Sequence, residues 1–587
     1  MHKDLLENKN FQTTPWIKAV LVVLLALNII SIVILAGVPP VSRDALTHHL
    51  AVPKLYLKHG SIYEIPDVEF SYYPMNLDLL YMIPLYFGND IIPKYIHFAF
   101  ALLTSFLIFG YLQKRLDVLY ALLGAVFFLS LPIILKLSIT VYVDLGLVFF
   151  STAALIYLFK WINNDYKIKY LLISAVCGGL ALGTKYNGLI ALFILTVFIP
   201  FVFISDAKKK IKVSDSEAKS SLIKIQLKAV GFGAIFIFIA MMVFSPWMIR
   251  NYIWKANPIY PLYEQIFNHY RPVSPDTKTE QQILETDTDP EQTSEAKSTR
   301  WSPFAIRKVI YGEPLWKIAL IPVRIFFQGR DDSPKHFDGK LSPFLFLLPF
   351  FSLFQISRNS PALRTEKKIF IFFVTLFILY AFSMTSIRIR YIAPIIPPLV
   401  ILSIFGFHNI AYALTNRWKN LPNWFSKGCI LFLGGAVLSY NGIYIFQQFN
   451  YVQPFSYLSR QMGRDAYIVK YRPEYSIFQY ANNHLSDNSK ILGLFLGNRR
   501  YYSDRELIFG VNDFKESVYR SDSADRLLKD LEKNGYTHLI IRFDLINRWM
   551  SEQLGERKKE MLKEFFAAYI QLILSKDGYG LFELKKI

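Results

Sequence analysis

Apolar segments long enough to span a bilayer recur along this chain, and they constrain its fold more than any other feature. A helix needs about 20 apolar residues to cross a hydrocarbon core of about 30 Å. The chain has 587 residues, of which 53% are hydrophobic and only 19% are charged. A soluble chain of this length would carry more charge and divide into several domains. The composition therefore predicts a polytopic membrane protein whose fold is mainly α, a transmembrane helix bundle.

Eleven segments are apolar enough to be predicted as spans, and several are short enough to be tilted, broken or partly interfacial. They cover residues 16–36, 93–112, 118–137, 143–160, 170–186, 188–205, 229–247, 342–356, 369–386, 391–412 and 428–447. The text "AGVPPVSRD" after the first span lacks a small-x-small cleavage site. This favours an uncleaved anchor over a signal peptide.

The net charge of +20 could indicate nucleic-acid binding, but its distribution argues against that function. Lysines and arginines are concentrated in short loops between the apolar segments. With a cytoplasmic N-terminus, every strongly basic short loop falls on the same side, as the positive-inside rule expects. The only cysteines, Cys177 and Cys429, form no disulfide framework and no Cys zinc site.

This topology puts four segments outside: the loops 37–92 and 248–341, the short turn "TSIRIRY", and the tail 448–587. We therefore divide the chain into a transmembrane catalytic domain, 1–447, and an extracytoplasmic domain, 448–587.

Two of the outer loops have distinctive composition. In the first, residues 44–59 and 70–88 are amphipathic or Tyr-rich and interrupted by proline, which predicts two interfacial segments, the first of them helical. In the second, residues 275–299 are polar and acidic, which predicts disorder.

The tail has the composition of a soluble α/β domain. "KILGLFL" and "THLIIRF" are predicted strands, and "SADRLLKDLEKNG" is a helix closed by Gly535. Residues 557–578 are predicted as one long amphipathic helix before a last strand, "YGLFELKK". The sequence contains no GxGxxG motif and no P-loop, so nothing indicates nucleotide binding.

Asp44 is the first candidate catalytic residue. It follows the first span, where an acid could simply favour the start of a helix. His48 is four residues later on the same face of a predicted helix. The pair could share a hydrogen bond, hold a divalent metal ion or lie hydrated at the interface, and a metal would need further ligands.

Asp144 is the second candidate. It lies at the outer end of the fourth span, and an acid at the edge of a span is costly and functional by default. A snorkelling or capping acid is the alternative.

Several cations fall on the same outer side as the two acids. The most informative are Arg388 and Arg390, because the positive-inside rule disfavours cations in so short an outer turn. Lys185 and Arg250 lie at other outer span ends. Together they predict a site for an anion at the membrane surface, such as a lipid phosphate.

In these candidate residues and the motifs around them, the chain resembles the polytopic GT-C glycosyltransferases. Relatives include protein O-mannosyltransferases, lipid A aminoarabinose transferases and lipopolysaccharide-core glycosyltransferases. The resemblance covers residues 16–412 and rests on Asp44, Asp144, "GLALGTKYNG", "PWMIRNYIWKANPIYPL" and "RIRYIAPIIPP". The chain differs from several relatives at "RDALTHH" in the first outer loop. Those relatives have a pair of acidic residues there, whereas this chain has one acid followed by two histidines.

The resemblance implies an inverting transfer of a sugar from a polyprenyl-phosphate donor to a lipid, glycan or protein acceptor. This would occur on the outer face of a bacterial inner membrane, with the tail extracytoplasmic. Asp44 would act as the base. Asp144 would orient the partner of Asp44, bind the sugar or acceptor, or complete a metal site. The substrate-binding residues would be His48, Lys185, Arg250, Arg388, Arg390 and Tyr391. The resemblance implies no particular cofactor, and Asp44, His48 and Asp144 could hold a divalent metal ion.

Three other functions remain open from the sequence. A lipid or small-anion transporter would show broken polar helices near the midplane, often in repeated halves. An oligosaccharide ligase or polymerase would use a different lipid-linked donor. A non-catalytic scaffold would tolerate replacement of Asp44 and Asp144.

Overall fold

The computed structural model describes residues 15–210, 215–267, 302–354, 361–384, 387–417 and 422–585. These residues form two compact units, which we name by their content. The membrane unit comprises Met1–Ala36, Tyr73–Leu80 and Pro93–Gln453, and the tail unit comprises Gly37–Tyr72, Tyr81–Ile92 and Pro454–Ile587. The tail unit therefore includes most of the predicted first outer loop. The predicted disordered segment 275–299 lies outside the described residues.

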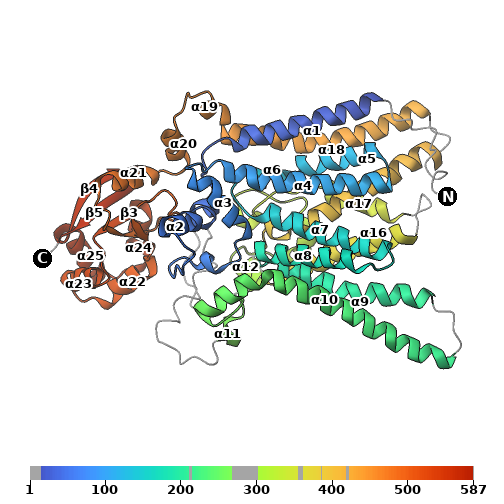
Figure 1. Ribbon diagram of the computed structural model, residues 1–587. Helices are drawn as coiled ribbons and strands as arrows, with labels where there is room; N and C mark the ends of the chain where they lie inside the picture. Colours follow the sequence, from blue (N-terminus) through green and yellow to red (C-terminus); the bar gives the residue numbers. More distant parts are fainter. Residues whose placement is uncertain are drawn as a thin grey trace. The chain divides into compact units, whose positions relative to one another are not determined.

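The membrane unit is built from long helices, and all eleven predicted spans fall on helices (Figure 1). These are α1 (Pro15–Ala36), α4 (Ile92–Arg115), α5 (Val118–Ser130), α6 (Pro132–Ser138), α7 (Asp144–Asn163), α8 (Ile168–Thr184), α9 (Gly188–Lys210), α10 (Asp215–Lys255), α15 (Phe344–Leu353), α16 (Pro361–Met384), α17 (Ile396–Tyr412) and α18 (Asn423–Val452). A 3₁₀ helix (Ile389–Ile395) precedes α17, and the short helices α11 (Glu264–Phe267), α12 (Pro303–Val309), α13 (Leu315–Ala319) and α14 (Ile321–Arg324) lie between α10 and α15.

Among the described residues, seven helices are long and apolar enough to cross a membrane. The number rises to eight if α5 and α6, bent by 63°, form one span. Two other predicted spans, α8 and α15, are shorter apolar helices. The chain is a multi-pass membrane protein.

The bend between α5 and α6 breaks the span predicted at 118–137, and proline is its cause. Pro132 is the first residue of α6, and Leu131 before it has an extended conformation with ψ 134°. The proline ring disfavours a helical conformation at the preceding residue. The backbone therefore leaves the helix at Leu131 and starts a new one at Pro132.

Small residues allow close packing of the helices around α8. In Figure 1, α7 and α8 lie side by side, and α8 also packs against α10. A Cβ atom at Gly179 of α8 would lie only 2.5 Å from the carbonyl oxygen of Ala240 in α10. Small residues at such contacts let helix backbones approach within a membrane.

The tail unit contains a five-stranded sheet of order β2-β1-β3-β5-β4. Strands β2, β1 and β3 are parallel, and the pairs β3–β5 and β5–β4 are antiparallel. The strands are β1 (Lys490–Leu494), β2 (Glu506–Ile508), β3 (His538–Arg542), β4 (Ile570–Lys576) and β5 (Tyr579–Leu584). The helices of this region are α19 (Pro454–Leu458), α20 (Arg464–Tyr471), α21 (Tyr475–His484), α22 (Val511–Arg520), α23 (Ala524–Lys533), α24 (Phe543–Gln553) and α25 (Glu556–Ala568).

Two helices of the first loop belong wholly to the tail unit and agree with the prediction for 44–59. A π-helical turn covers Ala45–His49, and α2 covers Ala51–His59. In the interfacial segment predicted at 70–88, the structure has a 3₁₀ turn (Glu69–Tyr72) and α3 (Asn76–Tyr86).

The prediction of one helix over 557–578 is wrong. Helix α25 ends at Ala568, and β4 and β5 form a hairpin around Asp577 and Gly578. Both turn residues have positive φ, 53° and 84°, which Asp-Gly pairs adopt readily in two-residue hairpin loops. The pairing of β4 with β5 overrides the helical pattern.

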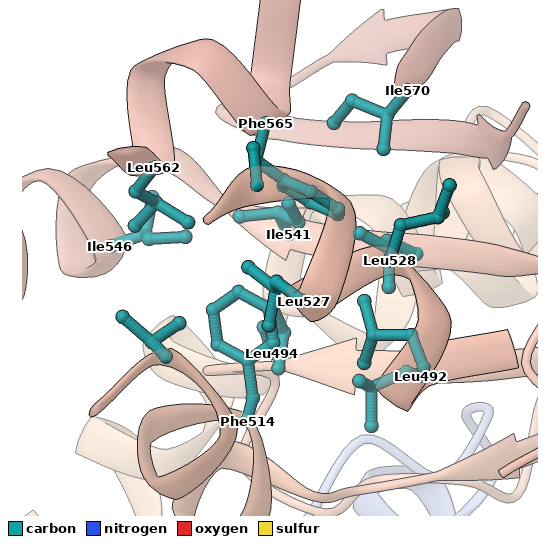
Figure 2. Packing of buried hydrophobic residues seen from close by; sticks show 14 of the residues in the cluster. Leu492, Leu494, Phe514, Leu527, Leu528, Ile541, Ile546, Leu562, Phe565 and Ile570 are labelled. Carbon is teal, nitrogen blue, oxygen red and sulfur yellow. The ribbon is translucent and has the colours of Figure 1, made fainter. Parts of the chain in front are cut away.

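One face of this sheet packs against α22 to α25 through a buried hydrophobic core. Figure 2 shows Leu527 and Leu528 of α23 in one cluster of buried side chains with Ile541 of β3 and Phe565 of α25. Leu527, Leu528 and Phe565 are completely buried. Burial of apolar side chains of this size stabilises a fold by about 1.5–3 kcal/mol each.

Replacing Leu528 by alanine should destabilise the tail unit by about 2 kcal/mol or more, because a cavity would remain in this core. Hydrogen exchange of the β3 amides would measure the lower free energy of opening. The matched control is Leu572→Ala, since Leu572 is 51% exposed. Equal protection of β3 in the two variants would contradict the prediction.

Candidate active site in the membrane unit

A buried carboxylate begins helix α7. Asp144 is the first residue of this helix and is completely buried. Its Oδ1 atom accepts a hydrogen bond of 2.7 Å from Nζ of Lys185. Its other oxygen, Oδ2, is buried and has no hydrogen-bond partner within the part of the chain that the structure describes. This carboxylate oxygen keeps unused capacity to accept a hydrogen bond.

His97 of α4 supports the start of α7. Its Nε2 atom accepts the backbone N–H of Leu145 at 2.9 Å. Its Nδ1 atom lies 3.0 Å from the carbonyl oxygen of Leu137 and 3.1 Å from that of Thr140. Because Nε2 accepts and Nδ1 faces carbonyl oxygens, the ring is the neutral tautomer with its proton on Nδ1. His97 therefore satisfies one of the free N–H groups at this helix end.

Lys185 is held where helix α8 ends. It is the residue that follows the helix and has an extended backbone, with φ −162° and ψ 142°. Its Nζ atom lies 5.0 Å from the centre of the Tyr391 ring, in addition to its ion pair with Asp144. The lysine side chain is 18% exposed, so the ion pair is mostly excluded from solvent.

Arg390 completes a cationic group around the same aromatic ring. Its guanidinium lies 5.2 Å from the ring centres of both Tyr142 and Tyr391. Both Lys185 and Arg390 are close enough to interact with the charge of Asp144. The structure thus brings together four predicted site residues, Asp144, Lys185, Arg390 and Tyr391, which we call the Asp144 cluster.

Two other predicted cations have different surroundings. Arg388, two residues before Arg390, lies 3.7 Å from a carboxylate oxygen of Asp338. Arg250 donates to Asn251 Oδ1 and to the backbone carbonyl of Tyr73. Its guanidinium also lies 4.6 Å from the Trp247 ring centre. These contacts fix the orientation of both arginines.

The described partners of Arg250 link it to the turn that carries Lys185. Asn251 donates to the hydroxyl of Tyr186 and to the carbonyl of Tyr260, each at 3.2 Å. Tyr186 is the neighbour of Lys185 in the chain and donates to the same Tyr260 carbonyl. A single buried network therefore connects the end of α10 with the end of α8.

Asp44 and His48 belong to the tail unit. The sequence prediction placed Asp44 and His48 one turn apart in an ordinary α-helix. In the structure Asp44 immediately precedes the π-helical turn Ala45–His49, so the predicted α-helical spacing of the pair does not hold. His48 is buried and stacks on Phe70 at 4.3 Å, and its Nδ1 lies 2.9 Å from Thr47 Oγ1. Thr47 Oγ1 also donates to the backbone carbonyl of Asp44. Such π-turns occur frequently at functional sites.

The described residues include no group of three or more His, Cys, Asp or Glu side chains that could hold a metal ion. The metal site considered for Asp44, His48 and Asp144 stays a prediction.

Sequence reasoning missed His97 and Tyr142. The signal for His97 was available, since an ionisable residue inside a predicted span marks a functional position by default. Tyr142 carried no such signal, because its role depends on the distant Arg390.

Comparison with known proteins agrees with this architecture. Residues 87–249 match the family model described as dolichyl-phosphate-mannose-protein mannosyltransferase. This segment includes Asp144 and Lys185 and covers less than half of the chain. No curated protein sequence matches the chain.

Solved structures match over nearly the whole chain. ArnT from Cupriavidus metallidurans, bound to undecaprenyl phosphate, has a TM-score of 0.54 at 13% identity, with 97% of this chain and 98% of that chain covered. The apo oligosaccharyltransferase of Archaeoglobus fulgidus has a TM-score of 0.52 at 12% identity, covering 94% and 73%. The same organism's AglB, in complex with an inhibitory peptide and a dolichol-phosphate, has a TM-score of 0.50 at 11% identity, covering 96% and 74%.

The helix bundle and the tail therefore define a polytopic membrane protein with the fold of the GT-C glycosyltransferases. The predicted resemblance is confirmed at the level of the fold.

Proposed function

We propose that this protein is an inverting glycosyltransferase that moves a sugar from a polyprenyl-phosphate donor to a lipid, glycan or protein acceptor. The observation that carries the proposal is the Asp144 cluster: a buried carboxylate, two cations and the Tyr391 ring at the end of a membrane-length helix. Charged groups are retained at such positions when they serve a function. The shared fold with ArnT and AglB, and the family model match, support the same conclusion.

The donor chemistry explains why cations would be needed. When the bond between the anomeric carbon and the phosphate oxygen breaks, its electron pair stays on the leaving phosphate, which gains negative charge. Preorganised cations in a water-poor site stabilise such a charge strongly. We assign Lys185 and Arg390 to the leaving phosphate, and Arg388 to a more distant part of the donor.

The acceptor must lose a proton as it reacts. Its hydroxyl oxygen forms the new bond to the anomeric carbon on the face opposite the leaving group, which inverts that centre. A positioned carboxylate can accept the hydroxyl proton as general base. We assign this role to Asp44. Asp144 would orient Lys185 through Oδ1 and receive a sugar or acceptor hydroxyl at Oδ2.

The distribution of charge supports a proposal for the side of the membrane on which transfer occurs. The basic short loops favour a cytoplasmic N-terminus and an extracytoplasmic tail under the positive-inside rule. We therefore propose that transfer occurs on the outer face of a bacterial inner membrane, where a lipid tail holds the donor at the surface.

The two arginines of the outer turn, Arg388 and Arg390, should contribute unequally to kcat/KM. Replacing Arg390 by methionine should lower kcat/KM by about tenfold or more, because it removes a cation of the Asp144 cluster. Arg388→Met should have a smaller effect, since Arg388 faces Asp338. Steady-state kinetics with a fixed acceptor would compare the two. A larger loss in Arg388→Met would reverse our assignment of the arginines.

Sugar transfer by the purified protein in nanodiscs tests the proposal. The donors would be a panel of polyprenyl-phosphate sugars together with a lipid-linked oligosaccharide, and the acceptors a crude lipid and glycan extract. Consumption of a monosaccharide donor would support the proposed transferase. Consumption of only the oligosaccharide donor would indicate a ligase. Lipid translocation without consumption of any donor would indicate a transporter.

A further inference from the structure

One loop of the tail makes repeated contacts with the first outer loop, within the tail unit. The loop covers residues 497–505, "GNRRYYSDR", and connects β1 with β2. It begins with two residues of positive φ, Gly497 at 69° and Asn498 at 58°. Glycine adopts such a left-handed conformation without steric cost, and asparagine adopts it more readily than most residues. We call this segment the 497–505 loop.

The central contact reaches the turn that follows Asp44. The backbone N–H of Tyr501 donates to the carbonyl oxygen of Leu46 at 3.0 Å. Leu46 is the second residue of the π-helical turn Ala45–His49, which begins directly after Asp44. A main-chain hydrogen bond from the tail therefore lies two residues from the proposed base.

Lysines of helix α2 hold the other side of the loop. Lys54 Nζ donates to the carbonyl of Tyr501 at 2.8 Å, to that of Ser503 at 3.3 Å and to Asp504 Oδ1 at 2.7 Å. Lys58 Nζ donates to the carbonyl of Asp504 at 3.0 Å. Two lysines one helical turn apart thus bind the backbone of the 497–505 loop.

Further contacts lie before and after the π-helical turn in the sequence. Tyr502 donates its hydroxyl hydrogen to the carbonyl of Pro40 at 2.8 Å. Arg500 forms an ion pair with Asp67. Pro40 precedes Asp44 by four residues and Asp67 follows the turn, so the contacts bracket the proposed base along the chain.

We propose that the 497–505 loop is a positioning segment for Asp44, so that the tail is part of the catalytic apparatus. This inference rests on the proposed function of Asp44. A general base must be held within hydrogen-bond reach of the proton it removes. A displacement of about 1 Å can cost about a hundredfold in rate. The hydrogen bond from the Tyr501 N–H to the Leu46 carbonyl holds the backbone of the turn after Asp44, and the stacking of His48 on Phe70 holds its side-chain face.

Hydrogen exchange of the full-length protein tests the physical contact without requiring activity. In Lys54→Met, amides of residues 42–50 should exchange about tenfold faster, because the loop loses three hydrogen bonds from Lys54. The matched control is Lys558→Met, since Lys558 also binds two backbone carbonyls of the tail unit, those of Tyr519 and Ser521. Unchanged exchange in Lys54→Met would overturn the inference.

Kinetics test the consequence for catalysis. Tyr502→Phe and Lys54→Met should each lower kcat about tenfold, with the KM for the donor unchanged within twofold. Lys54→Arg should recover much of the loss. Tyr519→Phe is the matched control for Tyr502→Phe, because Tyr519 also donates to a backbone carbonyl, that of Gln553. A rise in KM without a change in kcat would overturn the positioning role. Equal losses of kcat in the variants and in the control would also overturn it.

The two experiments separate failure of this inference from failure of the proposed function. If the wild-type protein consumes no donor, the proposed function fails, and the positioning role for catalysis fails with it. If the wild-type protein is active and Lys54→Met changes neither exchange nor kcat, only the positioning role is wrong.

Discussion

Replacing Asp44 by asparagine should lower kcat about 10²–10⁴-fold, with the protein still folded and the donor still bound. Asparagine keeps the shape of the side chain but cannot accept a proton, so the acceptor hydroxyl would have to react without a base. Single-turnover transfer with saturating donor would measure the chemical step. This is the largest rate effect that we expect from any single substitution in the chain.

The control for this variant is Asp522→Asn, because Asp522 lies at the surface of the tail unit with 73% of its side chain exposed. It should leave kcat unchanged. Equal kcat in Asp44→Asn and the wild type would remove Asp44 from the mechanism. A loss of folding, seen as a lower unfolding temperature, would require the conservative variant Asp44→Glu to decide the role.

The largest effect on stability should come from Lys185→Met. This substitution leaves the carboxylate of Asp144 buried without its ion-pair partner, and breaking a buried pair on one side costs about 3–5 kcal/mol. Denaturant or SDS titration of the protein in bicelles would measure the free energy of unfolding. The side chains are 18% and 1% exposed, so solvent screens the pair only weakly.

The double variant Asp144→Asn/Lys185→Met distinguishes this cause from a simple packing defect. It removes both charges and should recover most of the stability lost in Lys185→Met, while staying inactive if the Asp144 cluster binds substrate. Lys114→Met is the matched control for the single substitution, because Lys114 is exposed at the end of α4. A double variant no more stable than the single one would show that charge burial is not the cause.

Some properties of this protein follow from the order of its residues alone. The apolar segments predict the helices because a bilayer offers the backbone no hydrogen-bond partners, so a spanning segment must satisfy its own. The strands at 490–496 and 537–543 were predicted for a similarly local reason, their short apolar runs between turn residues. Asp144 was found because an acid beside an apolar segment is conspicuous in sequence.

Contacts between distant residues decided the rest. Residues 144, 185 and 390 lie far apart in the chain, and only the packing of α7, α8 and the 3₁₀ helix brings Asp144, Lys185 and Arg390 together. The helix predicted at 557–578 ends at Ala568 because β4 pairs with β5. Likewise, hydrogen bonds from the 497–505 loop join the first outer loop to the tail within one unit. A sequence pattern records local preference, whereas ion pairs, strand pairing and loop contacts depend on which distant side chains the fold brings within a few ångströms.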